Sequence, residues 1–285
     1  MRTIAISLMR LLPTSSRPVI ADLLRGLVYP IAFLLRQVVR GLMMFAAVGA
    51  TVALCVRPST WTHAVRQELA RQLFKTAVTA VPFAIMVALG IGVFVVVQAQ
   101  QWLDRLGHTS LLGPLLVMSV VRELGPLATN MLVIGRSGTS MTAEIGNMKM
   151  LGEIDLLDAQ GVDPFVYLIV PRILGTGLAV TCLTLIVLVV SIGSGRLLAL
   201  ELTSDPSRLV TFADQILQSL ELIDVFNFLA KTFLTGMLTG AICCVTGLQI
   251  TGDTAGVATA AREAFVRCMA ALLVVSAFVS LTIYI

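Results

Sequence analysis

The chain has 285 residues, of which 57% are hydrophobic and 13% are charged. Soluble globular domains carry about 25% charged residues, so the composition excludes that class and indicates an integral membrane protein. The formal net charge of +4 does not indicate a nucleic-acid partner, because the basic residues gather ahead of the first long apolar run. Side chains in that position are expected to meet anionic lipid head groups.

Residues 1–75 are predicted to form a cytoplasmic N-terminus with an amphipathic helix at the membrane interface. The run Leu27–Val56 is apolar, but one side of its helical wheel is charged. The charged residues are Asp22, Arg25, Arg36, Arg40 and Arg57. This pattern favours a helix lying in the interface, with a sixth span over Gly41–Val56 as the alternative. Arg10 interrupts the first apolar run, so no cleaved signal peptide is expected.

Residues 76–285 are predicted to form one membrane domain with five transmembrane helices. Crossing a hydrocarbon core of ~30 Å takes about 20 helical residues, and the gaps between charges have roughly that length. The predicted spans are Thr76–Leu103, Leu106–Gly135, Ile173–Gly195, Thr232–Gly252 and Cys268–Ile285. Basic residues precede the first span, which places the N-terminus in the cytoplasm and, after five spans, the C-terminus outside.

The second predicted span contains two adjacent charges, Arg122 and Glu123, followed closely by Pro126. A charge at the bilayer centre costs about 2.5 to 3.5 kcal/mol, so it is expected to be paired or to face a polar cavity. Pro126 should free the carbonyl of Arg122 and kink the helix. Asn130 extends the polar stripe of Glu123, and Lys231 in the fourth span is the natural counter-ion for that carboxylate.

These five residues are predicted to line a substrate path through the membrane, because intramembrane ionisable groups are usually functional. The alternative is that Arg122 and Glu123 satisfy helix packing or reach toward an interface.

The polar stretch "AEIGNMKMLGEIDLLDAQGVDP" predicts a short amphipathic helix around Met148–Gln160. Its apolar residues at helical spacing are Met150, Leu151, Ile154 and Leu157. The acidic residues of the stretch are Glu144, Glu153, Asp155 and Asp158, which taken alone suit a solvated face. Gly161 is expected to end this helix, and Asp163 with Pro164 to open the third span.

Glycines inside the spans predict close helix packing. Gly236 and Gly240 have the small-xxx-small spacing, for which a dimer interface is the alternative. Gly135, Arg136 and Gly138 are assigned to packing as well. On the other side of the membrane, Leu209–Ile223 predicts an amphipathic helix at the interface. Five cysteines in or beside apolar runs and two isolated histidines predict neither a disulfide framework nor a metal or cofactor site.

Five short motifs occur in the order and spacing of a known family. They are "RELGP" (Arg122–Pro126), "GRSG" (Gly135–Gly138), "AEIG" (Ala143–Gly146), "GVDP" (Gly161–Pro164) and "VPR" (Val170–Arg172). With them the chain resembles the MlaE/YrbE permease family, the membrane subunit of MCE-type lipid ABC transporters. The detailed likeness covers Leu116–Gly175, and a looser one runs from about Gly41 to the C-terminus.

The resemblance implies an all-α integral membrane protein of the bacterial inner membrane. It has an N-terminal interfacial helix, five transmembrane helices and a cytoplasmic coupling helix, here at about 144–161, that docks on an ABC ATPase. It also implies a homodimer whose shared cavity holds a phospholipid beneath a periplasmic MCE-domain protein, with a small STAS-type subunit as a further partner. The acids and the apolar stripe named above would then contact the ATPase.

Two departures from the family pattern bear on these expectations. Gly152 stands at the usual glutamate of the coupling helix, so Glu153 and Asp155 are expected to carry most of the charged contact. The last span has no acidic residue between Cys268 and Ile285, so a charge network that reaches this helix is not expected. The residues before Gly26 have no counterpart in the resemblance.

The predicted function is therefore the permease subunit of an ATP-driven lipid transporter, which is not itself an enzyme. The chain lacks the G-x-x-x-x-G-K-[ST] phosphate loop, so ATP hydrolysis is expected on a separate chain. The alternatives are a proton-coupled secondary transporter, an intramembrane enzyme and a structural membrane subunit. No repeated halves, HEXXH motif or GxSxG elbow supports the first two.

Overall fold

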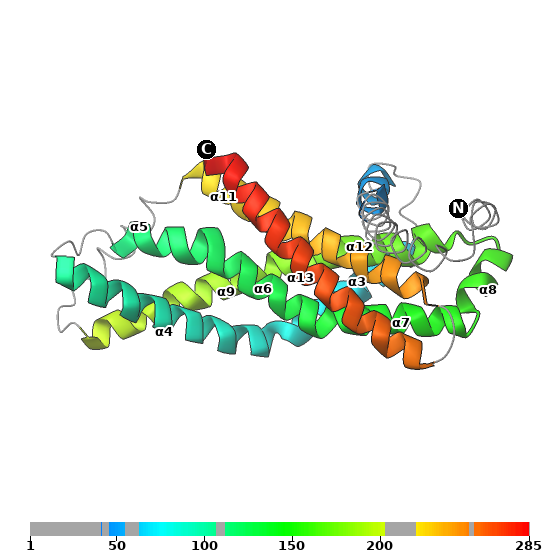
Figure 1. Cartoon of the computed structure of the whole chain (residues 1–285), viewed down its shortest axis with the longest axis horizontal. Helices are drawn as coiled ribbons and strands as arrows, with labels where there is room; N and C mark the ends of the chain where they lie inside the picture. The colour runs from blue at the N-terminus through cyan, green and yellow to red at the C-terminus, as the bar shows by residue number, and fades with distance from the viewer. Residues whose placement is uncertain are drawn as a thin grey trace, which may run out of the picture. The chain divides into compact units, whose positions relative to one another are not determined.

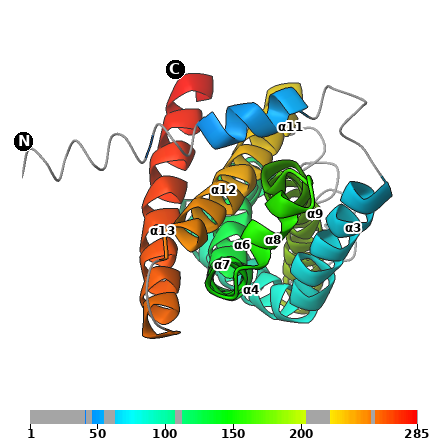
Figure 2. The ribbon, with the colours of Figure 1, turned by 90° about the vertical axis from the view of Figure 1, so that its right-hand side faces the viewer.

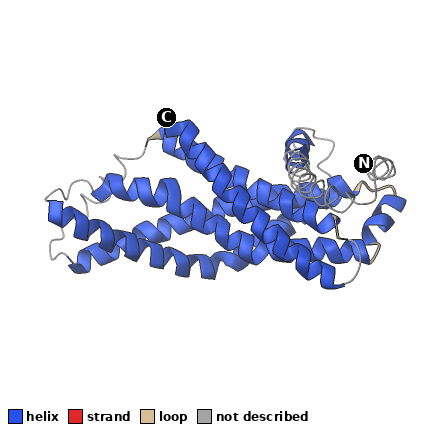
Figure 3. Cartoon of the chain, in the orientation of Figure 1, coloured by secondary structure: helices blue, strands red, loops and turns tan. Residues whose placement is uncertain are grey.

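The computed structural model describes residues 41, 46–54, 63–106, 112–202, 221–250 and 254–284. All secondary structure in these ranges is helical, which confirms the all-α class (Figure 3). Most of the predicted interfacial helices Leu27–Val56 and Leu209–Ile223 lies outside the described residues. The helices from residue 47 onward belong to one compact unit, Ala47–Ile285.

Five helical stretches of the described chain are long and apolar enough to cross a membrane, which confirms the predicted number. They are His63–Trp102, Pro114–Met150, Phe165–Leu197, Leu222–Leu248 and Gly256–Ile283. Figure 1 shows them side by side, with a short helix, α8 (Glu153–Ala159), at one end of the bundle, which is called the α8 end below.

Each span is assembled from one or more of the labelled helices. The first consists of α3 (His63–Thr76), the 3₁₀ turn η2 (Val78–Ala80) and α4 (Val81–Leu106). The second consists of α5 (Leu112–Leu116), η4 (Val117–Leu124), α6 (Gly125–Val133), η5 (Ile134–Gly138) and α7 (Thr139–Met150). The third joins η6 (Phe165–Ile169) to α9 (Val170–Leu202), and the fourth joins α11 (Leu222–Leu229) and η7 (Ala230–Leu234) to α12 (Thr235–Leu248). The fifth is α13 (Thr254–Tyr284).

Several spans are longer than the gaps between charges predicted. The second continues past Gly135 to Met150, and the fourth begins at Leu222 rather than Thr232. Lys231, the charge that marked the predicted start of the fourth span, is paired with Glu123, and Glu144 in the added part of the second span is paired with Lys75. A paired charge costs far less in a membrane span than an isolated one, so the helix continues through it.

The central helix of the bundle is α9, which packs against α3, α4, α6 and α12. Its fully buried residues Ile173, Val180 and Leu183 face these neighbours, as expected of a helix that is apolar all round. The fifth span, α13, packs against α12 and α7 and lies at the side of the bundle in Figure 2.

Close approach between α9 and α12 depends on glycine, as the small-xxx-small spacing predicted. A Cβ atom on Gly236 would lie 2.9 Å from Gly177 Cα, and one on Gly240 would lie 3.0 Å from Ile173 Cα. Gly138 also packs closely, with Cys243 Sγ at 3.2 Å from such an atom. Backbone atoms cannot move aside as a side chain can, so the two glycines of α12 fix the distance between these helices.

We predict that Gly236→Ala destabilises the protein although alanine is the better helix former. The added methyl group has to push α12 from α9, and overpacking of this kind costs about 1 to 3 kcal/mol. The measurement is the unfolding temperature of the purified protein in mild detergent. The matched control is Gly193→Ala on α9, where nothing lies within 4 Å. That change should keep or raise the unfolding temperature, and equal behaviour of the two variants would contradict the packing role.

Candidate functional site

The predicted break at Pro126 takes the form of a π-helical segment, η4, that ends directly before Gly125. Proline lacks an N–H group and leaves the carbonyl of the preceding turn without its helical partner. Lys231 Nζ donates a hydrogen bond of 2.9 Å to the carbonyl of Arg122. The ammonium group of the fourth span therefore replaces a hydrogen bond that the second span lacks.

The same ammonium group forms an ion pair with Glu123, the partner that the sequence indicated. Lys231 Nζ lies 2.7 Å from Glu123 Oε1. The lysine side chain is 1% exposed, whereas the glutamate side chain is 41% exposed. A buried cation is tolerated when its donors are hydrogen-bonded and its charge is compensated, and both conditions are met here.

The network reaches the last span through a hydroxyl group instead of an acid. Ser280 of α13 donates a hydrogen bond of 2.7 Å to Glu123 Oε1. The sequence analysis did not expect the network to reach the last span, and this hydrogen bond corrects that expectation. A serine in an apolar span is a weak signal, because its hydroxyl commonly bonds to the backbone of its own helix.

Arg122 has a buried acid of its own, Asp224 on α11. Arg122 Nε lies 2.7 Å from Asp224 Oδ1, and its Nη2 lies 3.2 Å from Oδ2. Asp224 also accepts a hydrogen bond of 3.1 Å from the backbone N–H of Glu221, as part of a capping box that begins α11. The sequence placed Asp224 between spans, so this pair was not predicted.

Asn130 completes the polar contact between the second and fourth spans. Its Nδ2 donates to the carbonyl of Pro126 at 2.9 Å, and its Oδ1 accepts from Thr235 Oγ1 at 3.0 Å. The structure thus brings all five predicted network residues to one contact, where η4 and α6 face η7 and α12. It adds Asp224, Thr235 and Ser280 to them.

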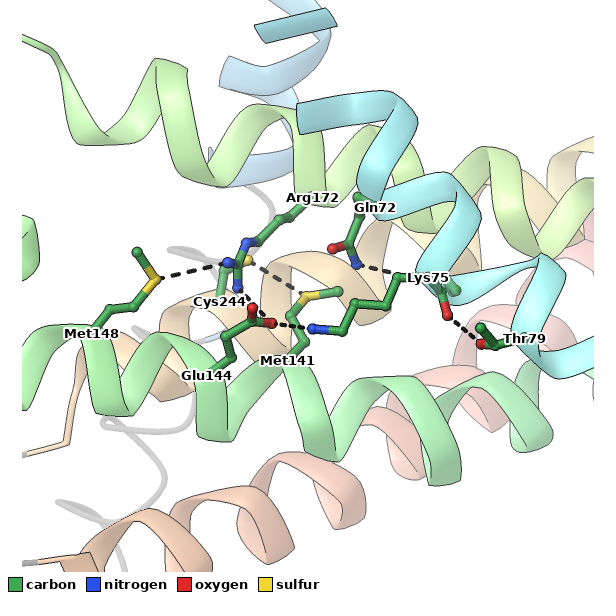
Figure 4. Close-up of polar contacts among 9 residues, drawn as sticks. Gln72, Lys75, Thr79, Met141, Glu144, Met148, Arg172 and Cys244 are labelled. Atoms are coloured by element: carbon green, nitrogen blue, oxygen red, sulfur yellow. Dashed lines mark hydrogen bonds and ion pairs between the residues drawn. The ribbon is translucent and has the colours of Figure 1, made fainter. Parts of the chain in front are cut away.

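A second charge cluster lies toward the α8 end and joins α3, α7 and α9 (Figure 4). Glu144 Oε2 lies 2.8 Å from Lys75 Nζ and 3.7 Å from Arg172 Nη1. Arg172 is 3% exposed and directs its Nη2 at Met148 Sδ, 3.8 Å away. Glu144 was assigned to the coupling contact with an ATPase, but its carboxylate is engaged within the chain.

The predicted coupling helix is two helices, not one. α7 ends at Met150, Gly152 has a left-handed backbone with φ of 72°, and α8 begins at Glu153. Gly152 is the position at which this chain departs from the family pattern, and glycine adopts that conformation at little cost. Glu153, Asp155 and Asp158 are exposed as expected.

The apolar face of α8 differs from the predicted stripe. Leu151 is 75% exposed, and Leu156, which the spacing did not select, is 60% exposed. Ile154 and Leu157 are half-buried, and Met150 is 37% exposed. The break at Gly152 rotates α8 relative to α7, so one continuous stripe does not form. The result is a short helix with acids and a leucine accessible to a partner.

The ends of this segment are capped as predicted. Gly161 has φ of 77°, and the N–H groups of Gly161 and Val162 donate to the carbonyls of Asp158 and Leu157 at 2.9 and 3.1 Å. This is the Schellman pattern that ends many helices. Asp163 Oδ1 then accepts from the N–H of Phe165 at 2.9 Å and caps the third span.

We predict that Glu123→Gln lowers stability more than Lys231→Met does. The first change leaves a buried ammonium without its counter-charge. The second leaves only the neutral carbonyl of Arg122 without its donor and a partly exposed carboxylate that keeps Ser280. Breaking a buried pair costs about 3 to 5 kcal/mol, so the double variant should lose less than the sum of the single changes. The measurement is thermal unfolding in mild detergent.

The control for this cycle combines Glu123→Gln with Lys75→Met, which belongs to the other cluster. These two losses should add, because the groups share no partner. Strict additivity of the Glu123 and Lys231 changes would contradict their coupling.

Comparison with known proteins places this fold in a family. The family model described as "Permease MlaE" matches residues 69–282. A protein of Synechocystis sp. named "Probable ABC transporter permease protein" is 29% identical over 216 residues, which cover 75% of this chain and 81% of that protein. One of the same name from Rickettsia typhi is 29% identical over 204 residues, covering 72% and 78%.

A chloroplast relative is also similar. "TRIGALACTOSYLDIACYLGLYCEROL 1, chloroplastic" of Arabidopsis thaliana is 28% identical over 204 residues, which cover 72% of this chain and 58% of that protein. The matched region includes both charge clusters, the α7 to α8 break and most of the five spans.

Proposed function

Because the chain belongs to the MlaE permease family, we propose that this permease subunit serves an ATP-driven transporter that moves phospholipid, or a related lipid, between the inner membrane and a periplasmic MCE-domain protein. The observation that carries the proposal is the paired charge network inside the second and fourth spans. Glu123 and Arg122 keep 41% and 24% of their side chains exposed, although both are ion-paired. Partly exposed charge within a span suits a ligand with a polar head.

The surroundings of these charges suit the rest of a lipid. Met118 and Leu124, on the same span, are 61% and 39% exposed. A charged head group and apolar chains would therefore meet matching surfaces next to each other. The name of the Arabidopsis relative contains a diacylglycerol lipid, which supports a lipid as the substrate class.

The energy for transport would enter through α8. Its exposed acids and its exposed leucine offer both charge and apolar area to an ATPase on a separate chain. α8 packs mainly against α7, the helix that also carries Glu144. A push on α8 would therefore act on the second span, whose other half holds the Glu123 network.

Further partners follow from family membership alone. They are a second copy of this permease in a homodimer, the periplasmic MCE-domain protein and a small STAS-type subunit. In this arrangement the α8 end faces the cytoplasm and the C-terminus faces the periplasm.

We expect reversal of two acids on α8, Glu153→Lys with Asp155→Lys, to release the ATPase and abolish lipid movement. An exposed ion pair contributes only about 0 to 1 kcal/mol, so both acids are changed together. The readouts are co-purification of the ATPase and transport in reconstituted vesicles. The charge-conserving pair Glu153→Asp with Asp155→Glu serves as the control and should retain both. If the doubly reversed protein keeps its ATPase and still transports lipid, α8 is not the coupling element.

The proposed orientation predicts opposite labelling of the two termini. Single cysteines near Arg2 and after Ile285, in a background without the five native cysteines, are treated with a membrane-impermeant thiol reagent on intact cells. Only the C-terminal cysteine should react before the cells are opened. Reaction of both from outside would exclude five spans with a cytoplasmic N-terminus.

A further inference from the structure

A groove of about 800 Å³ lies between the first, second and fifth spans. Phe83 and Val87 of α4 line it on one side, Leu132 of α6 lies beside them, and Phe265 and Met269 of α13 close the other side. Its charged residue is Arg136 of η5. A largely apolar cavity of this size with one charged group is typical of sites for small amphiphilic ligands.

The side chains along the groove follow one order on both walls. On the second span, Ala128, Leu132 and Arg136 are spaced by four residues and share a helix face. On α13, Phe265 and Met269 share a face with Arg262, one turn earlier in the chain. Each wall therefore carries an arginine at one end and apolar residues along the rest of its length.

Both arginines lie toward the α8 end of the groove. The second span runs from η4 to α7 and α8, so Arg136 is closer to the α8 end than Leu132 is. α13 runs the other way: Val257 near its start packs with Ala143 and Ile250, whereas Ser280 near its finish reaches Glu123. The groove is consequently basic at one end and apolar along its length.

Arg136 was assigned to helix packing, but its side chain is exposed and lines the groove. It forms no ion pair with the residues that the structure describes, whereas Arg267 on α13 lies 2.5 Å from Glu263. An arginine within a membrane span is costly unless its charge is compensated. Its counter-ion has to come from outside this set of residues.

We propose that the groove binds a phospholipid of the leaflet on the α8 side, with an acyl chain along the apolar walls and the phosphate diester on Arg136. Eight residues separate Arg136 from Glu144, a rise of about 12 Å. The flexible stem of arginine carries its guanidinium from this depth toward the head groups. Guanidinium pairs well with phosphate because two parallel hydrogen bonds can form. Arg262, which is exposed one turn from Phe265 on α13, adds a second positive charge on the α8 side of the groove.

This site is separate from the Glu123 network. Arg136 stands thirteen positions after Glu123 along the second span, a rise of about 20 Å. Binding there requires neither nucleotide nor a partner protein, so it goes beyond the proposed transport function.

The test uses the purified full-length protein in a neutral detergent and phosphatidylglycerol with a diazirine in its acyl chain. After illumination, mass spectrometry locates the labelled peptides. We expect labels on the peptides that contain Val87 and Met269. Unlabelled phosphatidylglycerol should compete, whereas diacylglycerol, which has the same chains but no phosphate, should not.

Variants separate the head-group contact from the chain contact. Arg136→Gln should raise the half-saturating lipid concentration about tenfold, the effect of losing one charge-assisted hydrogen bond. Arg136→Lys should restore most of the binding, and Arg267→Gln, whose charge is already paired, should leave it unchanged. Ala128→Phe should block labelling by filling the groove. Elution of each variant as a single peak controls for folding.

Three results would overturn the inference. Equal competition by diacylglycerol, or unchanged binding by Arg136→Gln, would remove the phosphate contact. Efficient disulfide formation between two copies carrying Met131→Cys, without lipid labelling, would identify the groove as a subunit interface. Loss of ATP-driven transport with labelling intact would instead contradict only the proposed function, so the two failures are distinguishable.

Discussion

The fold of this membrane domain depends on one buried ammonium group, that of Lys231. Pro126 removes a helical hydrogen bond in the second span, and the carbonyl of Arg122 then needs a donor at a depth where water is scarce. Lys231 supplies that donor at 2.9 Å, and Glu123 at 2.7 Å compensates its charge. The proline and the lysine are thus each acceptable in the membrane because the other is present. Replacing Lys231 alone would leave the carbonyl of Arg122 without a donor and Glu123 without its counter-charge.

This contact requires the fourth span to approach its neighbours closely, which apolar side chains alone would not allow. Gly236 and Gly240 bring the α12 backbone against α9, and η7 continues the same span toward η4. Lys231 lies in η7, and Glu123 lies in η4, so both partners come from π-helical segments. Such segments widen the helix by one residue per turn and often occur at functional sites. Small residues therefore set the distance between helices, and the ion pairs set their register.

The sequence predicted the parts of this arrangement that follow from the cost of an isolated charge. Glu123 and Lys231 had to find partners, and each was the other's nearest candidate within a span. Asp224 was missed because gaps between charges define spans only when charges are unpaired, and it lies paired inside the fourth span. Ser280 was missed since a hydroxyl group gives no comparable signal. The sequence predicted that Gly161, which has a left-handed backbone, ends α8. It did not predict the left-handed Gly152 before α8, because that glycine stands inside an apolar pattern that looked continuous.

The two charge clusters of the second span are satisfied to different degrees, and this difference bears on which end can move. At the Glu123 network, Lys231 makes two hydrogen bonds shorter than 3.0 Å, and breaking them would leave a buried cation. At the α8 end, Arg172 Nη1 lies 3.7 Å from Glu144, beyond hydrogen-bond distance, and the buried Nε of Arg172 has no hydrogen-bond partner in the described chain. The hydrogen-bonded pair at this end, Lys75 with Glu144, is 51% and 39% exposed, and an exposed ion pair contributes only about 0 to 1 kcal/mol, so displacing α7 costs less here. A force applied through α8 would therefore shift the Glu144 contacts first and reach the Glu123 network only through the rigid helix between them.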